Sequence, residues 1–362
     1  MKLGIVSTVN QKHMTLISHY TEILDFHNIE YDLIYFDRYD EEEKYTNAEK
    51  QYKYNVKINK NWSFPRKVIE YFKGRSFFIK NIKSNNYDYL IIWNTFTGIM
   101  LLDFLILSYK KKYFLNIRDY SFEKNYILFN LTKILIKGSK FTTISSEGFK
   151  SFLPPFNYLM LHSFNNKILT KKVNSFTKKD SELPLRITFI GNVRFYNQNK
   201  RILLKLKNDQ RFIMQYFGTN SEILKEFTEK NNIKNVEFLD SFDPFETESL
   251  LLKTDILNNF YGNKDIALDT AISIRLYYSA FMKIPILTSP ETYMSEMVTL
   301  ANLGFDIDIN SSNLGDLIFE NYHTLDVNKF SNGANTFMKK VTSDNFLFKK
   351  KLTEIIMEKN GE

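Results

Sequence analysis

The sequence has no cysteine among its 362 residues. A disulfide framework, a thiolate nucleophile and a zinc–thiolate site are therefore excluded, and the lack of cysteine fits a reducing compartment. Histidine is scarce as well, with only 5 residues, and they are scattered rather than spaced as metal ligands. We accordingly predict no metal site.

Long apolar runs are also nearly absent, and the N-terminal one is too short for a signal peptide. The segment Tyr89–Tyr109 approaches the roughly 20 apolar residues that cross a bilayer, but five polar or small residues interrupt it. We interpret Tyr89–Trp93 as a buried strand and Gly98–Tyr109 as a helix. A membrane-inserted hairpin or span is the alternative. The expected location is cytoplasmic.

Positive charge is concentrated in the first half of the chain. Residues 1–180 carry 28 Lys/Arg against 17 Asp/Glu, whereas residues 181–362 carry 21 against 24, which gives +11 and −3. A basic half with interspersed aromatic residues indicates an anionic partner such as a membrane surface, to which the protein would bind peripherally. A general lysine bias is the alternative. Nucleic acid is not expected, because no nucleic-acid-binding motif occurs. The aromatic residues are Trp62, Phe64, Tyr71, Phe72, Phe77 and Phe78.

Short apolar runs recur with spacings that leave room for helices between them, a pattern typical of βαβ units and parallel sheets. Two such series predict an α/β protein with two Rossmann-like doubly wound parallel-sheet domains facing a central cleft. The predicted strands are Leu3–Thr8, Tyr31–Asp37, Tyr87–Trp93, Lys112–Arg118, Phe141–Ser145, Tyr158–His162, Arg186–Asn192, Phe212–Gly218, Val236–Asp240, Asp255–Tyr261, Ile284–Ser289 and Phe305–Ile309. Residues 38–62 are charged and aromatic without a clear period, and we predict that they form a surface excursion, an irregular segment outside the sheet.

The predicted boundary between the domains is a polar segment. Residues 166–184 are rich in Asn, Lys, Ser and Thr and end in Pro184, as expected of a linker. We therefore predict an N-terminal domain over 1–165 and a C-terminal domain over 185–343. An amphipathic helix follows within 344–362.

Two motifs in the C-terminal domain suit an anionic ligand. After a predicted strand, Gly191 permits close backbone approach to a phosphate, while Arg194 and Lys200 supply positive charge. In the second motif, Arg275 and Tyr278 are three residues apart and share a helical face, where they could neutralise a diphosphate and contact a ribose. An ordinary strand–helix turn and ordinary helix packing are the alternatives.

These motifs resemble the donor-binding block of GT-B glycosyltransferases of the large "group 1" family. Arg275-Leu-Tyr277 and Pro285-Ile-Leu287 match the opening and close of that block, Lys-Leu-Tyr-Glu-Tyr-Leu-Ala-x-Gly-Lys-Pro-Val-Ile. Further matches follow in the expected order through residues 3–309: Ile117–Asp119, Thr143–Gly148, His162–Asn165, Phe189–Gly191, Asn235–Leu239 and Thr254–Ile256.

The resemblance implies an enzyme that transfers a sugar from a nucleotide sugar, most simply a UDP-sugar, with no cofactor and no metal. It implies that the C-terminal domain binds the donor, that the N-terminal domain binds the acceptor, and that the last helix returns to the N-terminal domain. The implied donor-binding residues are Gly191, Asn192, Arg194, Lys200, Tyr261, Asp269, Arg275, Leu276, Tyr277 and Tyr278. One departure stands out, because the family's ribose-binding Glu falls at Tyr278.

The acceptor hydroxyl needs a base. Asp119 follows a predicted strand and is the first candidate, and His13, in the loop after the first strand, is the second. A structural pair of Arg118 with Asp119 is the alternative. We expect a saccharide acceptor linked to polyprenyl phosphate, in surface or capsule polysaccharide synthesis. A non-catalytic GT-B-like partner subunit and a nucleotide-sugar epimerase remain as other functions.

Overall fold

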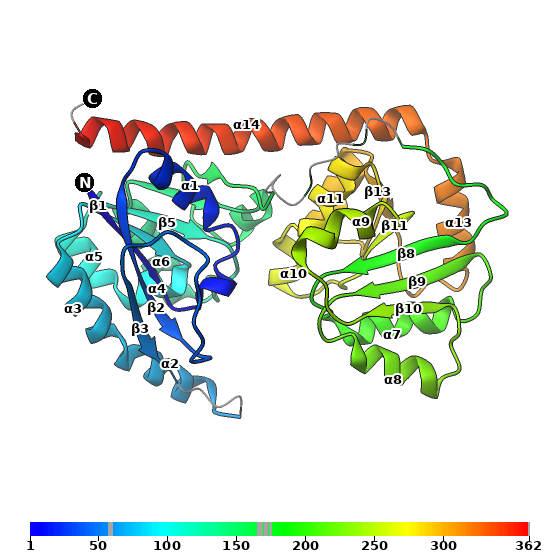
Figure 1. Ribbon diagram of the computed structural model, residues 1–362, viewed down its shortest axis with the longest axis horizontal. Helices are drawn as coiled ribbons and strands as arrows, with labels where there is room; N and C mark the ends of the chain where they lie inside the picture. The colour runs from blue at the N-terminus through cyan, green and yellow to red at the C-terminus, as the bar shows by residue number, and fades with distance from the viewer. Residues whose placement is uncertain (57–60, 165–168, 170–172, 174–175, 361–362) are drawn as a thin grey trace. The chain divides into compact units, whose positions relative to one another are not determined.

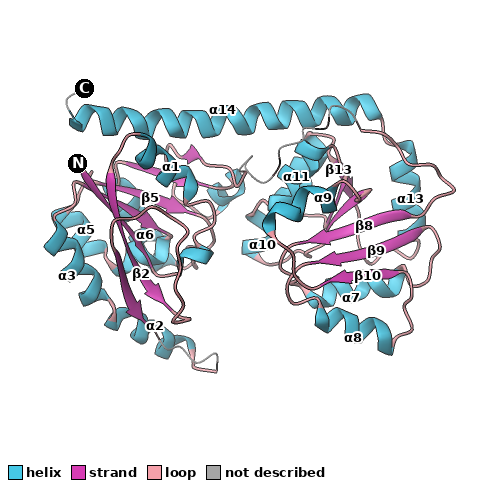
Figure 2. Cartoon of the chain, in the orientation of Figure 1, coloured by secondary structure: helices cyan, strands magenta, loops and turns pink. Residues whose placement is uncertain are grey.

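The computed structural model describes all residues except 57–60, 165–168, 170–172, 174–175 and 361–362 (Figure 1). The chain divides into two compact units. Unit 1 comprises Met1–Ser163 together with Ser343–Glu362, and unit 2 comprises Phe164–Thr342. Each unit has a parallel sheet flanked by helices, as the strands and helices of Figure 2 show.

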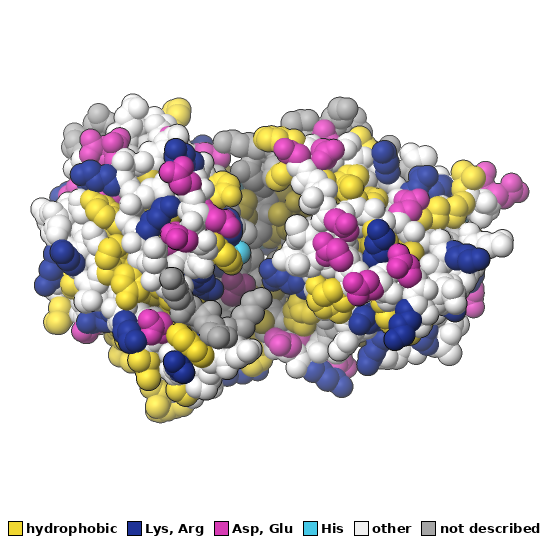
Figure 3. Space-filling model, turned by 60° about the horizontal axis from the view of Figure 1, so that its bottom comes forward, with side chains coloured by type: hydrophobic (Ala, Val, Ile, Leu, Met, Phe, Trp, Pro, Cys, Tyr) yellow, Lys and Arg dark blue, Asp and Glu magenta, His cyan; other side chains and the backbone are white. Residues whose placement is uncertain are grey.

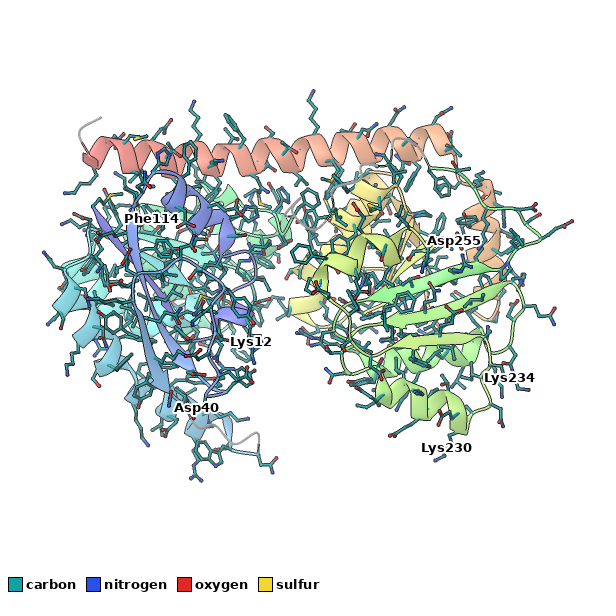
Figure 4. All side chains as sticks on the ribbon, in the orientation of Figure 1. Lys12, Asp40, Phe114, Lys230, Lys234 and Asp255 are labelled. Carbon is teal, nitrogen blue, oxygen red and sulfur yellow. The ribbon has the colours of Figure 1, made fainter. Side chains whose placement is uncertain are left out.

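The sheet of unit 1 has seven parallel strands in the order β3-β2-β1-β4-β5-β6-β7. Its central strands are buried along almost their whole length, which explains why they appear in the sequence as mainly apolar runs. Phe114, in the middle of β5, is fully buried (Figure 4). The strands are β1 (Lys2–Ser7), β2 (Glu30–Asp37), β3 (Gln51–Asn55), β4 (Tyr89–Trp93), β5 (Tyr113–Ile117), β6 (Phe141–Ile144) and β7 (Leu159–Met160).

The apolar segment Tyr89–Tyr109 lies within unit 1. It forms β4 followed by two short helices, α4 and α5, in agreement with the strand–helix interpretation. Within the described residues, no helix combines the length and the hydrophobicity that a membrane crossing requires. The helices are η1 (Gln11–His13), α1 (Ser18–Phe26), α2 (Phe64–Lys73), α3 (Arg75–Asn85), α4 (Thr95–Met100), α5 (Leu102–Ser108), α6 (Tyr126–Gly138) and η2 (Glu147–Ser151).

The sheet of unit 2 has six parallel strands in the order β10-β9-β8-β11-β12-β13. The strand order reverses direction between β8 and β11, and in such sheets ligands bind beyond the carboxyl ends of the strands at this switch point. The strands are β8 (Leu185–Ile190), β9 (Phe212–Phe217), β10 (Val236–Leu239), β11 (Ile256–Asn259), β12 (Ile286–Thr288) and β13 (Gly304–Asp306).

Helices connect the strands of unit 2 and cover its sheet. Asp255, labelled in Figure 4, lies directly before β11. Its carboxylate accepts a hydrogen bond from the Arg186 backbone N–H at 2.8 Å and forms an ion pair with Lys179 at 2.8 Å. The helices are α7 (Tyr196–Lys205), α8 (Glu222–Lys230), η3 (Pro244–Glu246), α9 (Thr247–Leu251), α10 (Ile266–Thr270), α11 (Ile274–Met282), α12 (Tyr293–Leu300) and α13 (Leu314–Thr324).

A single helix, α14 (Val327–Asn360), supplies side chains to both cores. His162, near the end of β7, fixes its later part in unit 1: the His162 backbone N–H donates to Asn345 at 2.8 Å, and the ring contacts Asp344 at 2.9 Å. Phe330, Ala334, Phe337 and Val341 belong to the core of unit 2. Phe348, Leu352, Ile355 and Ile356 belong to the core of unit 1.

The structure corrects one sequence prediction. The segment 38–62, predicted as a surface excursion, contains strand β3, which pairs in parallel with β2. Much of the predicted linker 166–184 lies outside the described residues, but Phe176 is buried in the core of unit 2 against Tyr322 and Phe330. The end of this segment therefore packs on unit 2. All twelve predicted strands are present.

Candidate functional site

Two glycine turns shape the carboxyl edge of the sheet in unit 2. Gly191 follows β8 with φ of 107°, and Gly218 follows the neighbouring β9 with φ of 138°. A Cβ on Gly218 would lie 2.0 Å from the carbonyl oxygen of Gly191, so the two turns pack backbone against backbone. The positive φ favours glycine at both positions, and at Gly218 the close approach also excludes a side chain. The backbone at this edge is therefore accessible to a ligand.

A pocket of about 250 Å³ lies beside these turns, between the ends of β8, β9 and β10 and the start of α11. Hydroxyl-bearing and apolar side chains alternate around it, and none of the described side chains that line it is acidic. This composition suits a ligand with an apolar ring, hydroxyl groups and negative charge. The lining residues are Ile190, Gly191, Asn192, Gly218, Thr219, Ser241, Phe242, Pro244, Thr247, Ile274 and Tyr278.

The N-terminus of α11 faces this pocket. Ser273 caps the helix, since its hydroxyl accepts a hydrogen bond from the Arg275 backbone N–H at 3.3 Å, and Ile274, the first helical residue, lines the pocket. The positive end of a helix dipole and its exposed N–H groups favour an anion. Asn192 lines the same pocket from the other side, after Gly191.

Tyr278 lies one turn into α11 and lines the pocket. Burial raises the pKa of its phenol above the ordinary value, although the charge of Arg275 acts in the opposite direction. The hydroxyl therefore keeps its proton near neutral pH and can donate a hydrogen bond. A role for this hydroxyl at the ribose, in place of the carboxylate expected from the resemblance, stays a prediction.

Arg275 does not point into the pocket. Its side chain is only 3% exposed, and its guanidinium stacks on the Phe189 ring at 3.8 Å. The guanidinium donates to the Ile190 carbonyl oxygen at 2.6 Å, to the Tyr261 hydroxyl and to Asn259 at 3.4 Å. These contacts hold the ends of β8 and β11 together. Both terminal nitrogens of the guanidinium therefore bind protein atoms, whereas its buried Nε has no hydrogen-bond partner among the described residues. Contact between Arg275 and a diphosphate stays a prediction.

Other predicted donor residues also lie away from the pocket. Leu276 and Tyr277 are fully buried in the core of unit 2, with the Tyr277 ring 5.8 Å from Phe337. Lys200 on α7 extends over the Phe227 ring of α8, 5.1 Å from its centroid. Packing inside the domain, rather than ligand contact, accounts for these three positions.

Three more predicted residues sit at the carboxyl edge of the sheet without lining this pocket. Arg194 is exposed, three residues after Gly191. Tyr261 is half-buried, and its ring packs 4.4 Å from that of Phe195. Asp269 is half-buried on α10. Arg194 is the one cation among these three residues, and it is close enough in sequence to reach a ligand at the Gly191 turn.

A second pocket, of about 410 Å³, opens at the same edge of unit 2 between α7 and the ends of β11, β12 and β13. Its lining is polar and includes basic and acidic side chains. Sequence reasoning missed it, because its residues come from four separate segments without a shared motif. The lining residues are Gln198, Arg201, Gly262, Asn263, Lys264, Ser289, Pro290, Glu291, Asp308, Ile309 and Asn310.

In unit 1, the two candidate bases follow strands of one parallel sheet. His13 ends η1 after β1, beside Lys12, which Figure 4 labels, and its ring nitrogen contacts the Tyr39 hydroxyl at 2.8 Å. Asp119 follows β5 and is exposed. Arg118 is buried, and its guanidinium donates to the Leu161 carbonyl oxygen at 3.2 Å. Asp119 is therefore available at the carboxyl edge of the sheet.

Glu123 is a buried carboxyl group that sequence reasoning missed. It is fully buried four residues after Asp119, and one of its oxygens accepts a hydrogen bond from the Ser121 backbone N–H at 2.5 Å. Burial raises the pKa of Glu123 above the ordinary value. Glutamate is rarely fully buried in folded proteins, and no sequence signal indicated the burial of this one. Among the described residues, no cluster of three or more carboxylate and histidine side chains suits a metal ion.

Three solved structures are similar to nearly the whole chain. Sucrose-phosphate synthase from Thermosynechococcus elongatus has a TM-score of 0.69 at 8% identity, covering 99% of this chain and 100% of its own. HepE from Anabaena, in complex with UDP, has a TM-score of 0.67 at 9% identity, covering 98% and 100%. WaaG, a glycosyltransferase involved in lipopolysaccharide biosynthesis, has a TM-score of 0.63 at 12% identity, covering 98% and 99%.

The chain has the GT-B fold. This confirms the predicted class of two Rossmann-like parallel-sheet domains. No protein-family model matches the chain, and no curated protein matches it in sequence. The resemblance to the group 1 family is therefore supported by the GT-B fold, while the narrower family and the capsular type remain predictions.

Proposed function

We propose that the chain is a glycosyltransferase that moves a sugar from a nucleotide sugar to a saccharide acceptor. The observation that carries this proposal is the pocket at the Gly191 turn, which combines a helix N-terminus, hydroxyl groups and no acidic lining side chain on a GT-B fold. HepE, which has the same fold, was solved with UDP and with UDP-glucose. A UDP-sugar is accordingly the proposed donor.

In this proposal the pocket holds the nucleoside and the first phosphates. The N-terminus of α11 and the backbone at Gly191 attract the diphosphate, and Arg194 adds an exposed cation from the same loop. The Tyr278 phenol donates to a ribose hydroxyl in place of the usual carboxylate. Leaving-group charge is thus stabilised by fixed dipoles and a cation, without a metal ion.

The acceptor is proposed to bind to unit 1. Asp119 is the proposed base for its hydroxyl and His13 the second choice, because both follow strands of one parallel sheet. A lipid-linked saccharide, carried on polyprenyl phosphate at the cytoplasmic face of a membrane, fits the net charge of +11 in residues 1–180. Surface polysaccharide synthesis is the corresponding process, and WaaG acts in lipopolysaccharide synthesis.

The first test is a thermal-shift and calorimetry panel of nucleotide sugars. A true donor raises the melting temperature, since it binds only the folded state. Arg194→Ala should weaken donor binding, whereas Lys200→Ala, whose side chain packs over Phe227, should not. Equal affinities for the wild type and Arg194→Ala would contradict the donor site.

Product analysis then separates the functions. If the wild type transfers sugar to an acceptor, and Asp119→Asn loses this activity while it still binds the donor, the proposed base is supported. Conversion of the donor alone, without an acceptor, identifies an epimerase. Donor binding without any turnover identifies a non-catalytic partner subunit, which the Tyr278 departure makes the strongest alternative.

A further inference from the structure

Helix α6 is anchored to unit 1 by one face only. Thr132, Leu135 and Ile136 are buried on that face, and the Tyr113 hydroxyl donates to the Leu135 carbonyl oxygen. The C-terminal end is capped by Lys111, whose ammonium donates to the carbonyl oxygen of Lys137 at 2.7 Å. These contacts fix the rotation of α6 about its axis, and hence which side chains face solvent.

The opposite face of α6 carries exposed apolar side chains. Ile127, the half-buried Leu131 and Ile134 are spaced four and three residues apart, so they form one stripe along the helix. Ile127 is 67% and Ile134 47% exposed, and Tyr126 at the start of the helix is 82% exposed. An ordinary surface helix places polar side chains at such positions. We call the surface formed by Tyr126, Ile127, Leu131, Lys133, Ile134 and Lys137 the α6 outer face.

Lysines border this stripe, and carboxylates are nearly missing. Lys133 and Lys137 lie on the flank next to Ile134, and both are exposed. Residues 104–146 contain seven lysines and one arginine against two carboxylates, Asp119 and the buried Glu123. The carboxylates just beyond this range, Asp103 and Glu147, are paired with Arg75 and Lys150. Figure 3 shows hydrophobic, basic and acidic side chains intermingled on one face of unit 1, so a surface from which carboxylates are nearly absent is a local feature of the α6 region.

We infer that the α6 outer face docks on an anionic lipid bilayer. An exposed apolar stripe with lysines on its flank is the composition that inserts into the headgroup region and attracts anionic lipids. A second copy of the chain fits less well, because an isologous contact would bring one positively charged patch against another. The exposed apolar residue Leu107, 84% exposed on the neighbouring α5, extends the apolar surface.

This docking would bring the proposed acceptor edge to the membrane. Asp119 precedes α6 by a short loop in which Phe122 is 56% exposed, so the loop and the helix would meet the lipid surface together. Only this placement rests on the proposed function. Vesicle binding requires no turnover, and donor binding requires no membrane, so failure of one is distinguishable from failure of the other.

The test is co-sedimentation of the full chain with vesicles of phosphatidylcholine alone or of equal parts phosphatidylcholine and phosphatidylglycerol. The wild type should bind the anionic vesicles at least about tenfold more tightly than the neutral ones. Ile127→Glu with Ile134→Glu, and separately Lys133→Glu with Lys137→Glu, should each weaken that binding about tenfold. If the glutamate pair at 127 and 134 does not fold, serine at both positions provides the measurement.

Helix α1 offers a control in the same unit. Phe26 is 78% exposed, but Glu22, one helical turn before it, is exposed and acidic, so this apolar side chain lacks a lysine flank that would attract anionic lipid. Phe26→Glu should therefore leave vesicle binding unchanged. The inference would be overturned if wild-type binding did not increase with phosphatidylglycerol, if Phe26→Glu weakened binding as much as the α6 variants, or if the substitutions at 127 and 134 dissociated a dimer.

Discussion

The guanidinium of Arg275 on α11 donates a 2.6 Å hydrogen bond to the carbonyl oxygen of Ile190, the last residue of β8. The same group contacts Asn259 at the end of β11 and stacks on Phe189. One buried cation thus fixes the two strands that flank the switch point of the sheet. The Gly191 turn depends on this support, because it begins at the residue after Ile190.

Replacing Arg275 by alanine should reduce stability and disturb the pocket together. The variant leaves the Ile190 carbonyl and Asn259 without their buried donor, which should cost about 2–4 kcal/mol. Chemical denaturation measures this loss. Arg194→Ala is the matched control, since an exposed arginine should change stability by less than about 0.5 kcal/mol. A stable Arg275→Ala protein would show that the cation does not support the turn.

Tyr278→Phe removes only a hydroxyl from the pocket. If that hydroxyl donates to the ribose, donor affinity should fall about fivefold to tenfold, the value of one hydrogen bond, while stability stays unchanged. Isothermal titration measures the affinity. Tyr216→Phe is the control, because the Tyr216 hydroxyl is fully buried in the same unit and should have no effect on donor binding. An unchanged donor affinity in Tyr278→Phe would remove Tyr278 from the donor site.

Glu123→Gln should stabilise the protein at neutral pH. Because burial raises the pKa of Glu123, the folded protein keeps this proton to a higher pH than the unfolded chain, so stability is lost as pH rises above the ordinary value of 4.5. Glutamine removes that loss and keeps an acceptor for the Ser121 N–H. The difference between the melting temperatures of variant and wild type should vanish as pH falls below this value. Glu147→Gln, at an exposed ion pair with Lys150, should show no such gain.

Phe348→Ala should destabilise unit 1, although the residue follows the whole of unit 2 in sequence. Phe348 is buried on α14, with its ring 4.8 Å from Tyr20 and 6.1 Å from Phe141. The truncation should cost about 3–5 kcal/mol. Phe346→Ala, two residues earlier and 60% exposed, should cost less than about 0.5 kcal/mol. Similar unfolding curves for the two variants would contradict the packing of α14 on unit 1.

The parallel sheets could be predicted from the sequence because both faces of their strands are covered. Such strands appear as apolar runs, continuous in Tyr89–Trp93 and broken only by Thr188 within Ile187–Ile190. Strand β3 gave no such signal. Its sequence, Gln-Tyr-Lys-Tyr-Asn, forms an edge strand that is mostly half-buried, and its polar residues resembled a loop.

The candidate site was harder to predict than the fold. Spacing placed Arg275 and Tyr278 on one helical face, but the two side chains have different environments: Tyr278 lines the pocket and Arg275 lies beneath the sheet edge. Motif order could not distinguish Tyr277, in the core, from Tyr278 beside it. Such differences depend on tertiary packing, which single-sequence spacing does not report. Gly191 carries a clearer signal, since glycine at a strand end indicates a special turn.

The sequence order of α14 has a consequence for how the chain folds during synthesis. The ribosome synthesises Met1–Ser163 first and then all of Phe164–Thr342. The α14 residues that complete the core of unit 1 are synthesised only afterwards. The core of unit 1 therefore stays incomplete, without Phe348 and Leu352, until unit 2 has been synthesised. Translation speed and chaperone access during that interval should govern the yield of native protein.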